Sequence, residues 1–195
     1  MSEATPRDAR RRFTVIYDAY YHRVLGYVLR RVGRDDAADI VAETFTVAWR
    51  RLDRVPGGEE ALYWLLATAR RTTSNHLRAE RRRHRLTEAI ASEPSRANAS
   101  IAEEASLERA ALALHRIRED ERELLLLMAW EGLDAAGVAM VVGCSRNAAR
   151  IRIHRARRRF AAALADVDAV KQNHESGHSF AAATAERNPR LEEQE

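Results

Sequence analysis

The stretch EGLDAAGVAMVVGCSRNAARIRIHRARRRF at residues 131–160 decides the fold of the second half of the chain. A short apolar segment at 134–142 is followed by Gly143-Cys144-Ser145 and then by a longer segment with apolar residues three or four apart: Ala149, Ile153, Ala156 and Phe160. This spacing predicts two amphipathic helices, the second with Ser145 as its N-cap and an end near Leu164. A short helix, a tight turn with glycine and a longer helix are typical of a helix-turn-helix motif.

The second of these helices is strongly basic. Residues 145–159 contain seven arginines and no acidic residue. In a helix-turn-helix protein the second helix enters the major groove of DNA, where arginine can pair with phosphates and guanine edges. A solvated basic surface is the alternative explanation. Helical spacing predicts one outward face, made of Asn147, Arg150, Ile151, His154 and Arg158.

The first 85 residues also favour helices, because they contain no alternating runs rich in valine or isoleucine. We expect helices at 13–32, 36–52 and 61–84, with a loop at 53–60 around Pro56-Gly57-Gly58. The second of these helices has an apolar stripe and an acidic outer face. The stripe contains Val41, Phe45, Ala48, Trp49 and Leu52, and the outer face contains Asp36, Asp39, Glu43, Thr46 and Arg50.

The third predicted helix carries a second basic surface. Residues 69–85 contain seven arginines against the single acidic residue Glu80. One face of this helix is predicted to present Thr68, Arg71, Asn75, Arg78 and Arg82. An ordinary solubilising face is the alternative, but two basic helices in two parts of one chain indicate contact with DNA at two separate places.

The remaining segments are predicted to be a linker, two further helices and a C-terminal tail. Residues 86–106 contain Pro94, four serines and several acidic residues, which is typical of a flexible linker. Helices are expected at about 107–118 and 121–130, and residues 166–195 read as a polar, flexible tail. The predicted fold is all-α, with two small helical domains at 1–85 and 107–165.

Composition excludes several other classes of protein. Basic residues number 33 and acidic residues 29, and every basic residue except Lys171 is an arginine. Cys144 is the single cysteine, so no internal disulfide can form. The longest apolar run, 124–130, is too short to cross a bilayer, and the first residues lack the apolar core of a signal peptide. We therefore expect a cytoplasmic protein without membrane insertion.

No enzyme motif stands out in the sequence. His174 and His178 are four residues apart, but Gly177 and the polar surroundings disfavour a helical metal pair. We expect no catalytic residue, no metal and no cofactor. An enzyme that uses these histidines is a distant alternative, and it would lose activity on truncation after Asp166.

Two blocks of the sequence resemble the extracytoplasmic-function (ECF, group 4) sigma factors of the sigma-70 family of RNA polymerase initiation factors. DAADIVAETFTVAWRRLDRV at 36–55 and YWLLATARRTTSNHLRAERRR at 63–83 look like region 2 of that family. The stretch quoted first looks like region 4. The resemblance implies a factor that directs core polymerase to promoters by binding the -35 element and melting the -10 element.

The resemblance also implies roles for particular residues and partners. The region that docks on the beta-prime coiled coil of core polymerase matches Asp36, Asp39, Ile40, Glu43, Thr44 and Phe45. Contact with the -10 element is implied for Asp53, Arg54, Arg71, Asn75, Arg78 and Arg82, the loop at 53–60 capturing a flipped base. Contact with the -35 element is implied for Ser145, Arg146, Asn147, Arg150, His154, Arg155 and Arg158. The polymerase beta flap and an anti-sigma factor are further partners that the resemblance implies.

The leading alternative function is a free-standing helix-turn-helix regulator that binds an operator as a dimer without polymerase. The acidic face at 36–43 argues against it, because such a regulator has no need of a docking surface for polymerase. The absence of an obvious dimerisation helix argues in the same direction.

Overall fold

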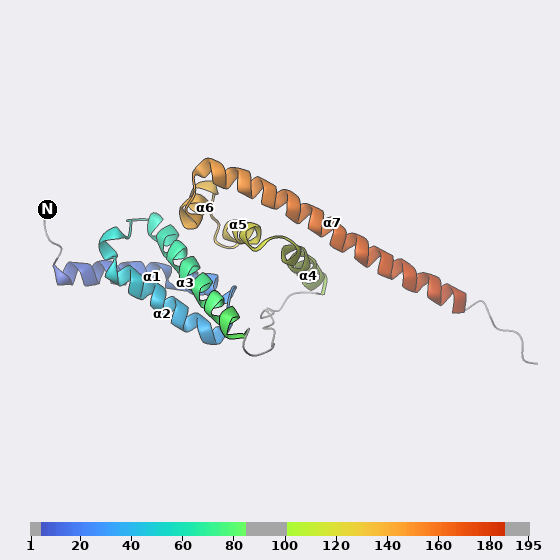
Figure 1. The fold of residues 1–195 in the computed structure, drawn as a ribbon, viewed down its shortest axis with the longest axis horizontal. Coiled ribbons are helices and arrows are strands. Elements are labelled where there is room, and N and C mark those ends of the chain that lie inside the picture. The colour runs from blue at the N-terminus through green and yellow to red at the C-terminus, as the bar shows by residue number, and fades with distance from the viewer. Residues whose placement is uncertain (1–4, 85–100, 186–195) are drawn as a thin grey trace, which may run out of the picture. The chain divides into compact units, whose positions relative to one another are not determined.

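A computed structural model describes residues 5–84 and 101–185; for residues 84, 101–104 and 171–185 it describes the backbone alone. In these ranges all regular structure is helical. The elements are α1 (Pro6–Leu29), α2 (Arg34–Arg50), the 3-10 helix η1 (Leu52–Arg54), α3 (Glu60–His84), α4 (Ile101–Arg116), α5 (Glu119–Ala129), α6 (Ala135–Val142) and α7 (Arg146–Ala185) (Figure 1). The prediction of an all-α chain is confirmed.

The chain divides into two compact units, each described here by itself. One unit comprises Met1–Ala97 and Leu126–Ile151, and the other comprises Asn98–Leu125 and Arg152–Glu195. The predicted linker at 86–106 falls largely outside the described residues, although Ile101 to Ser106 already belong to α4. The predicted domain limits at residues 85, 106 and 165 stay predictions.

In the first unit, α1, α2 and α3 pack side by side (Figure 1). The apolar spacing of each helix turns one stripe inward, as expected for amphipathic helices. The residues that fill this core are almost fully buried: Val24, Tyr27 and Val28 from α1, Ile40, Phe45 and Ala48 from α2, and Leu65, Leu66 and Ala69 from α3. Trp49 was predicted in the same stripe, but it is 45% exposed and meets the ring of Phe13 edge-on at 5.2 Å.

Helix α1 begins earlier than its apolar periodicity predicts, at Pro6 instead of Phe13. The reason is a local cap. The backbone N–H of Asp8 donates to Thr5 Oγ1 at 3.3 Å, and the Thr5 hydroxyl donates to Asp8 Oδ2 at 2.6 Å. Proline at the first helical position loses no hydrogen bond there, and its fixed φ suits the helix. The extra turns carry four arginines, at positions 7, 10, 11 and 12.

The last helix, α7, continues well beyond its predicted end near Leu164 and reaches Ala185. In the second unit Val167 is 3% exposed and forms a core cluster with Ala113, Ile117 and Ala163. Burial of Val167 favours continuation of the helix past Leu164, because packing of an apolar face supplies most of the stability of a helix in a protein. Arg109 Nη1 lies 3.4 Å from Asp168 Oδ1 and adds an ion pair to the same region. Residues 186–195 lie outside the described part of the chain.

Candidate nucleic-acid interface

The helix-turn-helix is built by side chains that cap its two helices. Asp134 Oδ1 accepts hydrogen bonds from the backbone N–H groups of Ala136 (3.0 Å) and Gly137 (2.8 Å), which fixes the start of α6. Gly143 ends α6 with φ +72°, a conformation that suits glycine. Ser145 Oγ then accepts from the N–H of Ala148 at 3.2 Å, which confirms the predicted N-cap of α7.

The seven residues predicted to contact the -35 element all lie on exposed positions at the start of α7: Ser145, Arg146, Asn147, Arg150, His154, Arg155 and Arg158. The opposite side of the helix is buried, with Ala149 and Ala156 at 0% and Ile153 at 4% exposure. Ile151 is 45% exposed and lies among the basic side chains. The beginning of α7 therefore presents a polar and cationic face that a DNA groove could receive.

Not every arginine of this helix is available to DNA. In the second unit, Arg159 donates to Glu121 Oε1, a carboxylate group on a residue that is only 4% exposed. Arg152 Nη2 lies 3.7 Å from Asp120 Oδ2. These two arginines pair with the start of α5, so the count of seven overstates the charge directed outward. Helical spacing could not distinguish these two paired arginines from the other arginines beside them, because both acidic partners lie more than thirty residues upstream.

The basic surface of α3 is exposed at each predicted -10 position: Arg71, Asn75, Arg78 and Arg82. Arg78 is held in place by two donated hydrogen bonds, to Ser74 O at 3.0 Å and to Asn75 Oδ1 at 2.9 Å. Thr68, expected on the same face, is 8% exposed and donates to Trp64 O at 3.0 Å. The exposed face of α3 therefore begins at Arg71, one turn after Thr68, where it was predicted to begin.

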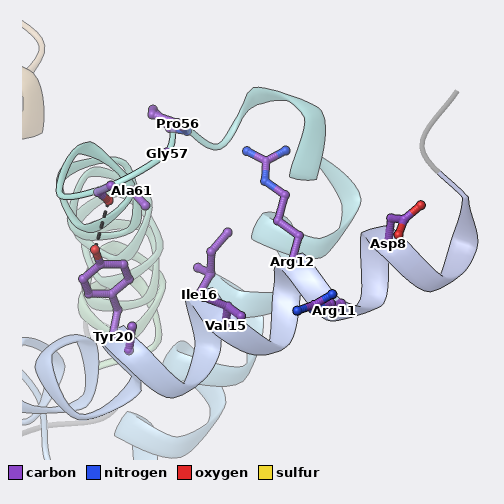
Figure 2. Close-up of a pocket in the computed structure, with 11 residues that line it drawn as sticks. Asp8, Arg11, Arg12, Val15, Ile16, Tyr20, Pro56, Gly57 and Ala61 are labelled. Atoms are coloured by element: carbon purple, nitrogen blue, oxygen red, sulfur yellow. Dashed lines mark hydrogen bonds between the residues drawn. The ribbon is translucent and has the colours of Figure 1, made fainter. Parts of the chain in front are cut away.

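The loop before α3 is anchored on α1 (Figure 2). Asp53 and Arg54, the two predicted loop contacts, are exposed. The Tyr20 hydroxyl donates to Gly58 O at 2.9 Å, and Arg12 donates to Val55 O. Gly58 has φ +60°, where a side chain would be strained. The roles of Arg12 and Tyr20 were not predicted from the sequence, because their partners are backbone oxygens about forty residues away.

The predicted outer face of α2 is exposed at Asp39, Glu43, Thr46 and Arg50, and half-buried at Asp36. Of the residues that the resemblance assigns to polymerase docking, Ile40, Thr44 and Phe45 are at most 4% exposed. Thr44 Oγ1 donates to Ile40 O at 2.8 Å, and Phe45 packs on the rings of Tyr17 and Phe13. These three side chains form the core under the exposed acids, and their assignment to the polymerase-binding region stays a prediction.

Asp36 lies beside two other residues that could ligate a metal. Asp36 Oδ1 is 3.2 Å and Glu80 Oε2 is 3.7 Å from His76 Nε2, and all three residues are half-buried. The His76 ring on α3 therefore lies against one carboxylate from the first turn of α2 and one from α3 itself. Asp36 thus has an internal partner, which leaves Asp39 and Glu43 as the outward acids. The side chains of His174 and His178 lie outside the described part of the structure.

Among the residues that the structure describes, no helix combines the length and the apolar character needed to span a bilayer. The features established so far are a helix-turn-helix whose second helix is cationic, a second basic helix and an exposed pair of acids on α2. Two basic helices in one chain are typical of a DNA-binding protein.

Comparison with known proteins identifies the family. Residues 16–83 match sigma-70 region 2, and residues 107–160 match sigma-70 region 4. The chain is 30% identical over 168 residues to the RNA polymerase sigma-H factor of Pseudomonas aeruginosa, covering 80% of this chain and 87% of that one. It is 29% identical over 170 residues to the ECF RNA polymerase sigma-E factor of Haemophilus influenzae, covering 80% and 88%. The chain belongs to the ECF-type sigma factors of the sigma-70 family.

Solved structures share the fold. The sigma factor RpoE of Bartonella quintana, in a complex with the anti-sigma factor NepR, matches with a TM-score of 0.57 at 22% identity, covering 81% of this chain and 97% of that one. CnrH, in a complex with the cytosolic domain of CnrY, matches with a TM-score of 0.56 at 22% identity, covering 80% of this chain and 90% of that one.

The confirmed function is that of an RNA polymerase sigma factor, a DNA-binding factor that directs the polymerase to promoters and initiates transcription. A free-standing regulator is not favoured.

Proposed function

We propose that this sigma factor reads the -35 element with the exposed face of α7 and opens the -10 element with the loop at 53–60 and the basic surface of α3. The observation that carries the proposal is the uninterrupted exposure of all seven predicted residues at the start of α7. In this proposal residues 1–85 form the polymerase and -10 domain and residues 107–165 form the -35 domain. The family matches at 16–83 and 107–160 lie inside these ranges and support them.

At the -35 element, Asn147 and Arg150 stand within the first two turns of α7, the part of a recognition helix that reaches base edges. Arginine pairs with guanine and asparagine with adenine through two hydrogen bonds, each pair discriminating by about 1–3 kcal/mol. His154, Arg155 and Arg158 lie further along and are suited to phosphates, which set register without reading sequence.

At the -10 element the proposed step is separation of the DNA strands, which breaks no covalent bond. Unstacking and unpairing one base costs a few kcal/mol, and the cost can be offset when the extruded base is held by the protein. The loop is suited to this role, because its two anchors on α1 fix its position before DNA arrives. Arg71, Asn75, Arg78 and Arg82 follow on α3 and are suited to guide the single strand by its phosphates.

For docking, the proposal assigns Asp39 and Glu43 to the beta-prime coiled coil of core polymerase. Both carboxylates are exposed on one face of α2, four residues apart and therefore adjacent on the helix surface. The -35 domain would meet the beta flap. In this proposal the chain acts by binding polymerase and promoter DNA, and no catalytic residue or cofactor is assigned to it.

Regulation by an anti-sigma factor is part of the same proposal. Both solved neighbours above were determined with an anti-sigma protein or with the cytosolic domain of a second protein. Because this chain shares their fold, the proposal is that it also binds an anti-sigma factor. The proposed place of action is the cytoplasm, where core polymerase and the chromosome are found.

The test is transcription in vitro with core polymerase on a pooled promoter library. The variant Arg150→Ala/His154→Ala removes one arginine and one histidine from the DNA-facing side of α7. The control His115→Ala/Arg116→Ala removes the same two residue types from exposed positions of α4. We expect specific initiation by the wild type and the control, and loss of -35-dependent initiation by the variant. Equal initiation by both double variants would contradict the -35 assignment.

A further inference from the structure

Three side chains that can ligate a metal meet where the first turn of α2 lies against the later turns of α3 (Figure 1). Asp36 belongs to that first turn, and His76 and Glu80 are four residues apart on α3, which places them on one face of the helix. One ligand atom from each side chain lies within 4.8 Å of the other two. Among the residues that the structure describes, these three form the one group of histidine, cysteine and acidic side chains close enough to surround an ion.

The distances between the ligand atoms fit a small four-coordinate cation. His76 Nε2 is 3.2 Å from Asp36 Oδ1 and 3.7 Å from Glu80 Oε2. In a tetrahedral site with zinc–ligand bonds of about 2.0–2.1 Å, two ligand atoms are about 3.3–3.4 Å apart. The nitrogen and the Asp36 oxygen therefore already have nearly this spacing, and the Glu80 side chain, which is 32% exposed, needs only a small movement to reach it.

The ring nitrogen of His76 gives independent evidence for a ligand. Nε2 is shielded from solvent and makes no hydrogen bond to any residue that the structure describes, although the Asp36 carboxylate is 3.2 Å away. A short distance is not enough for a hydrogen bond when the donor does not point at the acceptor. Buried polar atoms in native proteins almost always have a partner, and one without a partner is typical of a place where a water or an ion binds.

The donor set indicates the class of ion. Two carboxylates carry two negative charges, which one divalent cation balances and one imidazolium does not. Magnesium and calcium prefer oxygen ligands throughout, whereas an imidazole nitrogen suits zinc and its neighbours in the first transition row. Three protein ligands leave a fourth position for water, and the side chains are 22–38% exposed, which gives the ion a path from solvent.

We propose that Asp36, His76 and Glu80 bind one divalent transition-metal ion, and that Zn²⁺ is the ion their spacing fits best. The ion joins two helices through residues that are forty positions apart in the sequence, so it stabilises the packing of α2 on α3. Asp39, the first acid of the proposed docking pair, is three residues further along α2. None of the polymerase and DNA contacts proposed above requires the ion, and its binding can be measured on the free chain.

Isothermal titration calorimetry of the full chain with zinc chloride, after treatment with a chelator, counts the bound ions. Each site variant removes one ligand with little change in size: Asp36→Asn, His76→Gln and Glu80→Gln. The controls make the same chemical changes at exposed positions: Asp18→Asn, His115→Gln and Glu108→Gln. We expect one ion on the wild type to be lost or bound about tenfold or more weakly in each site variant, and to be kept in each control. No binding, or a titration that is the same in all variants, would overturn the proposal.

Thermal unfolding separates a metal site from an ordinary ion contact. Tryptophan fluorescence follows the packing of the two helices, since Trp49 lies on α2 and Trp64 on α3. Zn²⁺ at a hundredfold its Kd is expected to raise the Tm of the wild type by about 5–10 °C and to leave that of Glu80→Gln nearly unchanged. Mg²⁺ at the same concentration should not shift the Tm. Absence of a shift with Zn²⁺, or equal protection by Mg²⁺, would contradict a transition-metal site.

Nuclear magnetic resonance of the histidine rings identifies the ligand atom in the wild-type chain. Addition of Zn²⁺ should shift the ¹⁵N signal of His76 Nε2 and leave that of His115 in place. A shift confined to His174 and His178, the pair four residues apart near the C-terminus, would place the ion there and overturn the proposal. This measurement decides the question if a site variant does not fold. None of the three experiments contains polymerase or DNA, so their failure leaves the proposed function as it stands.

Discussion

Arg159 on α7 donates a hydrogen bond to Glu121 on α5, a residue that is only 4% exposed. Its neighbour Arg158 is exposed and belongs to the face predicted to meet DNA. Two adjacent arginines in one basic run therefore have different roles. One stabilises the fold of the second unit, and the other is available to a phosphate.

The first prediction concerns Arg159→Ala, which leaves the Glu121 carboxylate without its nearest cation. We expect the free energy of unfolding to fall by about 1–2 kcal/mol, since a buried acceptor loses a charged hydrogen bond. Arg118, 3.5 Å from the same carboxylate, limits the loss. The measurement is urea denaturation at neutral pH, and a midpoint equal to that of the wild type would contradict the structural role.

The second prediction is that Arg158→Ala changes DNA binding and leaves the stability of the fold almost unchanged. Stability should stay within about 0.5 kcal/mol of the wild type, because the residue is exposed. The salt dependence of holoenzyme binding to -35 DNA should decrease by about 0.9 in the logarithmic slope, the effect of one lost phosphate contact. Binding titrations at several salt concentrations measure this slope. An unchanged slope would remove Arg158 from the interface.

Val167 tests whether the helix beyond Leu164 is part of the folded second unit. Val167→Ala removes two methyl groups from a residue that is 3% exposed and packed on Ala113 and Ile117. We expect a loss of about 1–2 kcal/mol in stability, as for other large-to-small changes in a core. The control is Val170→Ala, three residues on and 52% exposed, which should change stability by less than about 0.5 kcal/mol. Equal effects of the two variants would argue against this packing.

The acidic face of α2 gives the fourth prediction. Asp39→Asn/Glu43→Gln removes both outward carboxylates and keeps the size of each side chain. We expect weaker association with core polymerase at low salt and a difference from the wild type that shrinks at high salt, because exposed charges are screened. Asp18→Asn/Glu108→Gln makes the same chemical changes at exposed positions elsewhere. If the control weakens association equally, net charge is responsible and the docking face is wrong.

Capping residues explain where sequence prediction of the helices succeeded and where it failed. The start of α7 was predicted to within one residue, because Gly143 and Ser145 are the residue types that helix ends require. The start of α1 was missed by seven residues, although Thr5, Pro6 and Asp8 carry comparable signals. There the apolar periodicity begins only at Phe13, and the prediction followed periodicity and overlooked the cap.

The end of α7 and the roles of individual site residues depend on contacts between distant segments. Val167 is buried only because it packs on Ala113 and Ile117, which are about fifty residues away in the sequence. The local sequence of residues 166–185 therefore predicts only a polar segment. Thr44 and Phe45 lie on α2 among residues that resemble a docking motif, and their burial follows from packing on α1. Spacing on one helix places residues on a face, but it cannot tell which face a neighbouring helix covers.

The anchors of the loop have a consequence for how such a protein can evolve. Arg12 and Tyr20 both bind main-chain oxygens, those of Val55 and Gly58. Any amino acid at position 55 would offer the same main-chain oxygen, although Val55 itself is 2% exposed and Gly58, at φ +60°, suits glycine. The two anchors therefore place no demand on the exposed side chains of Asp53, Arg54 and Glu59. In the proposed function, single substitutions at these exposed positions change promoter preference while the support on α1 stays the same.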